Sequence, residues 1–356
     1  MSAVTMNASS LIVPTKGATQ CNNRAAMAKV PAMPKVHAAR SVLAGQRVSA
    51  SQPLRMRSTR RGDLAVRAAV VEGLGGLQKV TLKSNEDTAE IYTFGGVCTS
   101  WKKNGQDVLY VRPDAKFDKS KPISGGIPHC WPQFGPGEMQ VHGFARNMQW
   151  ECTVASLDEC VMTLLPNDES RKMWPHEFKV TQTICLKGGG LTATLAVTNT
   201  DKAPFTFTGS YHTYFACTDI SDVKVSGLEG TTVMNRLTEK SSTQEGKVTV
   251  TGPIDSVYSD VSAPINLDVG GGRSVDIEYS GWPDAVVWSP WTDMASCYQE
   301  FVAVENAACK PVTVAPGTTW TGSMTLAVKD IVSFDPQLES FCEENPEALE
   351  CLVYDD

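Results

Sequence analysis

The pattern of apolar and polar positions from about Val70 onward consists of short runs broken by Gly, Pro, Asn and Asp, spaced as in β-sandwiches and barrels. The clearest run is residues 191–198, where apolar side chains alternate with three threonines and an alanine. A period of two predicts a strand with one buried face. The glycines at 188–190 predict a hairpin turn before this strand, since neither a Walker lysine nor a following helix accompanies them.

Two further runs put reactive side chains on defined strand faces. Residues 205–215 carry an aromatic row at positions 205, 207, 211 and 215, which is expected to enter the core, and His212 lies on the opposite, polar face. In residues 301–305, alternation puts Glu305 on the same face as Phe301 and Ala303, at the end of a strongly apolar strand. Both strands therefore offer a titratable group at one end.

The other runs complete an all-β domain. Further strands are predicted at residues 89–93, 99–103, 178–186, 247–251, 274–279, 285–288 and 321–328. Strands without intervening helices predict antiparallel sheets packed face to face, in one domain over residues 70–330. Residues 331–356 form an acidic extension, in which Asn345 and Pro346 predict the start of a short helix.

Charge is divided unevenly along the chain. Residues 1–67 hold eleven basic residues and one acidic residue, whereas the rest holds 21 basic and 38 acidic residues. The N-terminal composition predicts a transit peptide over residues 1–69, with the chloroplast stroma favoured over the mitochondrion; a retained basic tail is the alternative. The acidic remainder argues against a nucleic-acid partner, and no apolar run is long enough to span a membrane as a helix.

Several kinds of site have no signature in the sequence. The eleven cysteines form no Cys-x-x-Cys pair, and there is neither a His-Glu-x-x-His motif nor a Gly-x-Ser-x-Gly elbow. We therefore expect no metal site and no cofactor, which leaves proton transfer between histidine and carboxylate as the available chemistry. Glu305 is the leading carboxylate, although a strand-end glutamate reaching solvent is an alternative and the direction of its pKa shift stays open.

The histidines differ in their surroundings. His129 lies in a Gly- and Pro-rich loop, a type of segment that often carries function, and His142 is followed closely by Arg146. His176 precedes a strand and is expected to be structural. His142 and His212 thus join Glu305 as candidates for a site.

Six motifs in a fixed order resemble the glucose-6-phosphate 1-epimerase branch of the aldose 1-epimerase family. They are Gly-Gly-Ile-Pro at 125–128, Trp-Pro-Gln-Phe-Gly at 131–135, His-Gly-Phe-Ala-Arg-Asn at 142–147, His-Thr-Tyr-Phe at 212–215, Asp284 ahead of Val-Val-Trp-Ser-Pro-Trp at 286–291, and Glu305. The resemblance covers about residues 75–330. It implies a galactose-mutarotase-like β-sandwich and a cofactor-independent exchange of α and β anomers of a hexose 6-phosphate.

The resemblance also implies residue roles. Glu305 matches the general base that removes the proton of the anomeric hydroxyl, and His212 matches the general acid that protonates the ring oxygen. His142 and Asp284 match positions that hold sugar hydroxyls, and Arg146 matches a basic residue of the binding site. Gln133 and Ser124 are the remaining candidate substrate-binding residues.

Two departures from the family pattern bear on the substrate. Ser124 stands where phosphosugar-specific members have Arg, and Val141 stands where many relatives have Gln. A phosphate dianion favours guanidinium partners, so mutarotation of unphosphorylated aldoses is one alternative. A non-catalytic carbohydrate-binding or structural subunit is another, because fold alone permits it. We expect a monomer whose partner is a small hexose or hexose phosphate.

Overall fold

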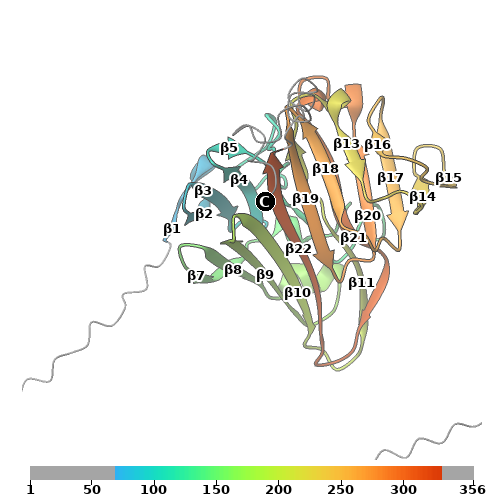
Figure 1. Ribbon diagram of the computed structural model, residues 1–356. Helices are drawn as coiled ribbons and strands as arrows, with labels where there is room; N and C mark the ends of the chain where they lie inside the picture. Colours follow the sequence, from blue (N-terminus) through green and yellow to red (C-terminus); the bar gives the residue numbers. More distant parts are fainter. Residues whose placement is uncertain (1–68, 331–356) are drawn as a thin grey trace, which may run out of the picture. The chain divides into compact units, whose positions relative to one another are not determined.

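A computed structural model describes residues 69–330 of the protein (Figure 1). These residues form 22 strands, one six-residue helix, α1 (Asp168–Met173), and five short 3₁₀ turns. Every strand pairing is antiparallel, which confirms the predicted all-β class. The predicted transit peptide, apart from residue 69, and the predicted C-terminal helix lie outside the described residues.

The strands build three sheets. The first has the order β1 (Val70–Glu72), β2 (Gln78–Ser84), β3 (Asp87–Tyr92), β4 (Val97–Lys103) and β5 (Gln106–Asp107). The second has nine strands in the order β16 (Val248–Thr249), β13 (Lys224–Ser226), β18 (Ile265–Gly270), β19 (Arg273–Ser280), β22 (Thr319–Asp330), β10 (Gly190–Asn199), β9 (Phe178–Lys187), β8 (Glu159–Leu164) and β7 (Glu151–Ala155).

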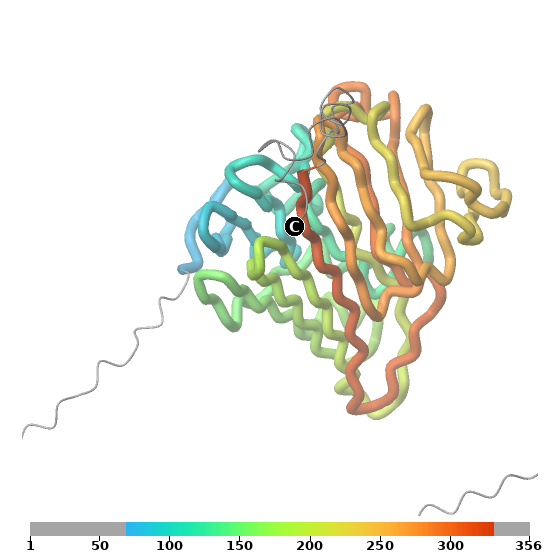
Figure 2. The backbone as a smooth tube through the Cα atoms, viewed as in Figure 1, coloured from blue at the N-terminus to red at the C-terminus, as the bar shows by residue number. Residues whose placement is uncertain are grey.

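The third sheet carries the candidate site. Its order is β15 (Lys240–Thr243), β14 (Thr232–Asn235), β17 (Ile254–Ser259), β20 (Asp284–Ser289), β21 (Phe301–Val314), β11 (Phe205–Tyr211) and β6 (His129–Cys130), and β12 (Tyr214–Ala216) also pairs with β21. In the tube view, residues near 200 and near 310, far apart in sequence, run side by side in this part of the molecule (Figure 2). We call it the site sheet.

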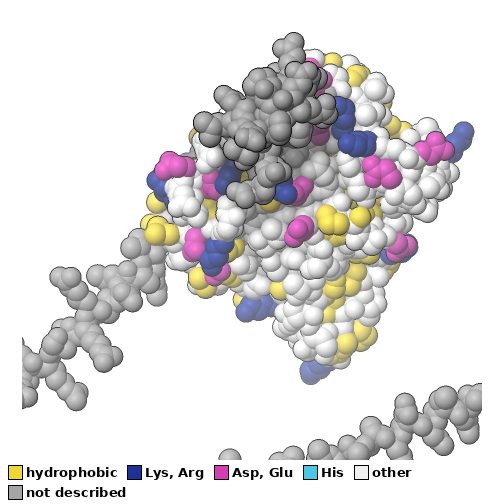
Figure 3. All heavy atoms as spheres, in the orientation of Figure 1, with side chains coloured by type: hydrophobic (Ala, Val, Ile, Leu, Met, Phe, Trp, Pro, Cys, Tyr) yellow, Lys and Arg dark blue, Asp and Glu magenta, His cyan; other side chains and the backbone are white. Residues whose placement is uncertain are grey.

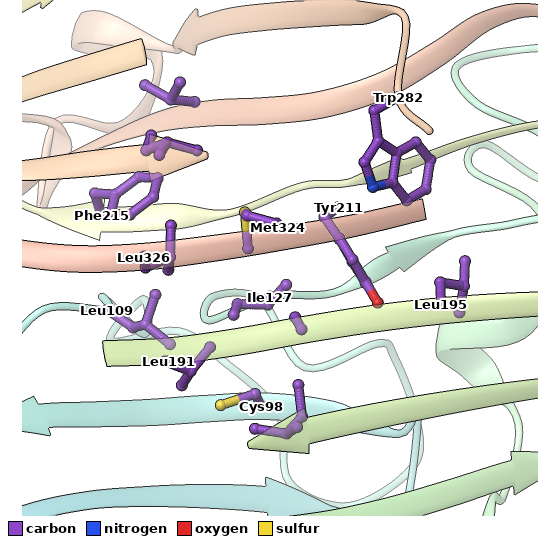
Figure 4. Close-up of a cluster of buried hydrophobic side chains, with 14 of the residues drawn as sticks. Cys98, Leu109, Ile127, Leu191, Leu195, Tyr211, Phe215, Trp282, Met324 and Leu326 are labelled. Atoms are coloured by element: carbon purple, nitrogen blue, oxygen red, sulfur yellow. The ribbon is translucent and has the colours of Figure 1, made fainter. Parts of the chain in front are cut away.

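The main core lies between the nine-stranded sheet and one face of the site sheet. Figure 4 shows Leu191 and Leu195 of β10 and Leu326 of β22 in one cluster with Tyr211 and Phe215 from the site sheet. All five side chains are buried. The alternation predicted for residues 191–198 is confirmed, because the same register that buries Leu191 and Leu195 leaves the threonines half-buried on the other face.

Local sequence explains the best-predicted hairpin. β9 and β10 meet at Gly188 and Gly189, whose φ angles of 61° and 77° lie in the left-handed region. Two consecutive residues with positive φ form the turn whose twist matches that of the strands it joins. The expected hairpin is therefore confirmed.

Two predicted strands have different bounds in the structure. The run 205–215 is interrupted, since β11 ends at Tyr211 and the backbone N–H of His212 donates to Pro128 O at 3.1 Å instead of continuing the ladder. β21 extends to Val314 because it is a central strand that pairs with β20 on one side and with β11 and β12 on the other. Partner strands, which lie far away in sequence, set both ends.

The surface over β18, β19 and β22 carries interspersed charges. On the face drawn in Figure 3, Lys and Arg side chains alternate with Asp and Glu among uncharged ones. Mixed signs of this kind do not form the basic stripe that binds phosphate backbones. Among the described residues, no helix is long and apolar enough to cross a membrane.

Candidate active site

Glu305 and His212 face each other on the site sheet, on the face that points away from the main core. Glu305 lies in the middle of β21 opposite Val286, and His212 lies in the break between β11 and β12. His212 Nδ1 is 3.4 Å from Glu305 Oε1, and the two residues are only 7% and 2% exposed. The site sheet therefore brings together an imidazole and a carboxyl group that are 93 positions apart in the chain.

Burial sets the protonation of Glu305. Desolvation raises the pKa of this carboxyl to about 8, because a buried carboxylate loses its hydration. A hydrogen bond from Ser210 Oγ to Glu305 Oε2, of 2.8 Å, and the charges of Arg236 and Arg146 oppose this rise. The sequence left the direction open, and the structure shows that burial outweighs the nearby cations.

His212 is enclosed by aromatic rings. Its imidazole stacks on Tyr214, with ring centroids 4.8 Å apart, and meets the edges or faces of Trp288 and His142 at nearly right angles. Burial, and then the positive charges of Arg146 and of any protonated His142, lower the pKa of His212 well below 6.5, with burial the largest cause. Between that value and about 8, the His212–Glu305 pair therefore holds a single proton.

His142 is a neutral hydrogen-bond donor at the edge of the pair. Burial and the charges of Arg146 and Arg236 lower its pKa to about 4. The backbone N–H of Gly135 donates to His142 Nδ1 at 3.2 Å, so the neutral ring carries its proton on Nε2. This N–H is suited to hold a sugar oxygen.

Gln133 organises the loop that presents His142. Its amide nitrogen donates to backbone oxygens of Gly135, Met139 and Gln140, and its carbonyl oxygen accepts from Met139 N–H. The amide group thereby ties together the two ends of residues 133–142. A direct contact between Gln133 and substrate stays a prediction.

Arg146 lies in a 3₁₀ turn, η2 (Ala145–Asn147), next to the same loop. Its Nη2 donates to Val141 O at 2.9 Å, while its buried Nε has no hydrogen-bond partner in the described part of the chain. The charge of Arg146 lowers the pKa of Glu305 and of His212. The structure thus places Arg146 near the pair, and its role in binding substrate stays a prediction.

Asp284 and Ser124 have different surroundings. Asp284 is 1% exposed, and its two carboxylate oxygens accept backbone N–H groups of Cys309 and Asp260. Asp284 lies on the same face of β20 as Val286, which is paired with Glu305. Its role in holding sugar hydroxyls stays a prediction. The carbonyl of Ser124 accepts from Arg112 N–H, and the side chain of Ser124 makes no hydrogen bond within residues 69–330.

The remaining two candidate histidines lie outside this group. His129 points into the main core, where it stacks on Trp150 with ring centroids 4.8 Å apart and contacts Gly96 O through Nε2 at 3.0 Å. His176 packs edge-on against Trp174. His129 is therefore a core residue in this structure, and a functional role for the loop at 125–137 stays a prediction.

Sequence reasoning missed Arg236, Asp255 and Phe134. The Arg236 guanidinium lies over the Phe134 ring, 5.2 Å from its centroid, and Arg236 Nη1 is 3.7 Å from Asp255 Oδ1. Phe134 packs on the site sheet beside Val286. No local motif marks Arg236, since only the pairing of β14 with β17 brings it to the site. No group of three or more metal-ligating side chains occurs in the region from residue 69 to residue 330.

Comparison with known proteins agrees with this geometry. Residues 78–327 match the family model described as aldose 1-epimerase. A protein of Cenchrus ciliaris named "Putative glucose-6-phosphate 1-epimerase" is 38% identical over 290 residues, which cover 73% of this chain and 87% of that protein. A Salmonella typhimurium protein of the same name is 30% identical over 231 residues, covering 60% of this chain and 76% of the relative.

Solved structures give the same fold. A structure titled as a putative mutarotase from Salmonella typhimurium superposes with a TM-score of 0.65 at 26% identity, covering 74% of this chain and 97% of the other. A "Putative aldose 1-epimerase" from Escherichia coli K12 has a TM-score of 0.60 at 16% identity, covering 72% and 100%. The expected galactose-mutarotase-like sandwich is confirmed.

A second family model matches at the C-terminus. Residues 332–355 match the CP12 domain. This stretch coincides with the acidic extension expected at 331–356 and lies outside the described residues. The aldose 1-epimerase model matches more than half of the chain, and the chain therefore belongs to the aldose 1-epimerase family.

Proposed function

We propose that this protein interconverts the α and β anomers of a hexose 6-phosphate, with glucose 6-phosphate as the leading substrate. Membership of the aldose 1-epimerase family makes the chain an isomerase. The observation that carries the proposal is the buried His212–Glu305 pair, 3.4 Å apart, which holds one transferable proton. Mutarotation needs one group that accepts a proton and one that donates a proton, and this pair offers both.

The reaction is balanced without any further reagent. One group of the pair takes the proton of the anomeric hydroxyl while the other protonates the ring oxygen, so the C1–O5 bond breaks and C1 becomes an aldehyde carbon. Rotation about C1–C2 and closure on the other face return both protons. For Glu305 to act as the base and His212 as the acid, the shared proton must lie on His212 when the sugar binds.

Three neighbouring groups oppose the effect of burial on Glu305 and so act towards that arrangement. Ser210 donates to Glu305, and Arg146 and Arg236 lower its pKa, so each of them stabilises the carboxylate form. The Nε2–H of His142 is available to hold a hydroxyl oxygen. These contacts support the base role of Glu305 that the family resemblance implies.

The substrate proposal draws on the relatives. Proteins 38% and 30% identical to this chain carry the name "Putative glucose-6-phosphate 1-epimerase". Ser124, in place of an arginine, favours unphosphorylated aldoses as the second candidate substrate class. The two candidates differ in whether a phosphate group adds affinity.

The test is anomer exchange followed by NMR, with glucose 6-phosphate and glucose as substrates. Glu305→Gln keeps the shape of the side chain but removes its acid–base function, so we expect catalysed exchange to fall by about 10²–10⁴-fold. Glu278→Gln, on an exposed position of β19 in the other sheet, is the matched control and is expected to retain wild-type exchange.

Each alternative has a distinct outcome. Wild-type exchange in Glu305→Gln, with an unchanged circular dichroism spectrum, would remove Glu305 from the mechanism. Equal kcat/KM for both sugars would favour the free-aldose interpretation. No exchange of either sugar by the wild-type protein would favour the non-catalytic carbohydrate-binding subunit.

We propose in addition that the protein functions in the chloroplast stroma. The support is the composition of residues 1–67, with eleven basic residues and a single acid. A fusion of residues 1–69 to a fluorescent protein should enter chloroplasts of leaf protoplasts, whereas the fluorescent protein alone should not. Accumulation of the fusion in mitochondria or in the cytosol would contradict the proposal.

A further inference from the structure

Arg236 reaches the active site from a part of the fold that carries no family motif. It follows β14, and its backbone N–H donates to Asp255 O at 2.8 Å, which fixes its position beside β17. Its guanidinium then lies over the Phe134 ring, 5.2 Å from the ring centroid. A guanidinium stacked on an aromatic face keeps its N–H groups directed outward in the ring plane.

Those N–H groups are largely unused. The closest carboxylate, that of Asp255, is 3.7 Å from Nη1, which is beyond hydrogen-bond distance, and the guanidinium makes no hydrogen bond to any residue between 69 and 330. In contrast, Arg112 and Arg171 each hold a carboxylate with two N–H groups. The side chain of Arg236 is 34% exposed, so a ligand can reach it.

The charge of Arg236 acts on the reacting groups. It lowers the pKa of Glu305 more strongly than Arg146 does, and it also lowers the pKa of His142. The basic residues near Ser124 offer less: the fork of Arg112 is already occupied by Asp114, and Lys119 and Lys121 are exposed and shift the pKa of none of Glu305, His142 and His212. Arg236 is therefore the cation best placed to meet a charged substrate.

We propose that Arg236 binds the phosphate group of the substrate, and so supplies the cation that the chain lacks at Ser124. The assignment rests on the proposed hexose-phosphate epimerase function. A phosphate monoester dianion accepts two parallel N–H···O hydrogen bonds from a guanidinium, and the cation–π contact with Phe134 holds Arg236 in advance. Because Asp255 does not occupy the fork, the phosphate need not displace a hydrogen bond.

The test compares two sugars in one variant. In Arg236→Gln, the ratio of kcat/KM for glucose 6-phosphate to that for glucose is expected to fall by about 10- to 100-fold, mainly through KM. Loss of the Arg236 charge also changes the acidity of Glu305, but this affects both sugars equally and cancels in the ratio. Arg236→Lys should restore part of the preference, since it keeps the charge but not the fork.

A second measurement uses inorganic phosphate as a competitive inhibitor of glucose exchange. Its inhibition constant should rise about tenfold or more in Arg236→Gln. Arg273→Gln, on β19 in the nine-stranded sheet, is the control for loss of one positive charge and should leave both the inhibition constant and the sugar ratio as in wild type.

The outcomes separate this inference from the function on which it rests. If the wild-type protein prefers glucose 6-phosphate and Arg236→Gln keeps that preference, the assignment of Arg236 is wrong while the function stands. If the wild-type protein shows no preference but phosphate inhibits it through Arg236, the hexose-phosphate function is wrong and the anion site stands. A fall of the ratio in Arg236→Gln alone supports both.

Discussion

At the residue scale, Glu305 and His212 face each other at 3.4 Å in a buried site, and burial shifts their pKa values in opposite directions. Above about pH 8 the carboxyl of Glu305 loses its proton while His212 is already neutral, so no proton remains for the ring oxygen. Below the lowered pKa of His212 both groups are protonated and no base remains. The active form therefore exists between these limits.

This argument predicts the pH profile of anomer exchange. The rate should be constant from below pH 6.5 up to neutrality and should fall as the pH rises through about 8. Glucose is the preferred probe because the phosphate of its 6-phosphate titrates near pH 6, at about the value of a phosphoserine. A profile that rises through pH 4–5 and stays flat beyond pH 9 would instead indicate an unperturbed, solvated carboxylate.

Ser210 offers a way to move the alkaline limb of the pH profile, which is the fall in exchange rate near pH 8. Its hydroxyl donates to Glu305 Oε2 at 2.8 Å and stabilises the charged carboxylate, so it lowers the pKa of Glu305. In Ser210→Ala we expect the pKa of Glu305 to rise further and the alkaline limb to move to higher pH. Ser256→Ala, on the core face of β17, should leave the limb in place. An unmoved limb in Ser210→Ala would show that another group causes it.

At the scale of elements, the segment at 125–128 joins the site sheet to the five-stranded sheet. Gly126 has a φ of 71°, its carbonyl accepts from Tyr214 N–H at 2.9 Å, and a Cβ there would overlap the carbonyl oxygen of Cys98. Gly105 also has a positive φ, of 80°, but has open space around it. A comparison of the two positions therefore separates the cost of a left-handed backbone from the cost of steric overlap.

Alanine substitutions at these glycines should differ in stability. Gly105→Ala should lower the free energy of unfolding by about 1–2 kcal/mol, the cost of a left-handed conformation. Gly126→Ala should cost about 1–3 kcal/mol more, because neighbouring backbone must shift, and it should also slow anomer exchange by displacing Tyr214 from His212. Denaturant unfolding measures both values, and equal losses would mean that the Cys98 contact relaxes freely.

The sequence predicts those elements whose signal is local. Alternation identified half of the 22 strands and put Glu305 on the face opposite Val302 and Val304, because a period of two is a local property. It did not identify α1, whose six residues are too few to show a period and whose start depends on the Asn167–Ser170 capping box. It also ended β21 at Glu305 although the strand runs to Val314, because the length of a central strand depends on its partners.

Arg236 and Phe134 show the corresponding limit for the site. They meet because the loop at 133–142 packs on the site sheet and β14 pairs with β17, and both are long-range features. The family motifs cover the catalytic pair and the loop but not this contact. Site residues within motifs were therefore predictable, whereas a cation brought in by strand pairing was not.

At the scale of the whole molecule, the β-domain is closed by its last strand. β22 pairs with β10 along one edge and with β19 along the other, so it joins the two halves of the nine-stranded sheet. Met324 and Leu326 of β22 are fully buried in the main core (Figure 4). The last strand is thus required to bury the core, although it carries no site residue.

This topology predicts where the chain can be shortened. Deletion of residues 331–356 should leave anomer exchange within about twofold of wild type, because every group assigned to the reaction lies between Ser124 and Glu305. Deletion from residue 319 onward should instead give insoluble or unfolded protein, since β10 and β19 would each lose a partner. Exchange assays and circular dichroism on both truncations check this. Loss of exchange in the shorter deletion, with the β-sheet spectrum intact, would mean that the segment matching CP12 takes part in catalysis or in its control.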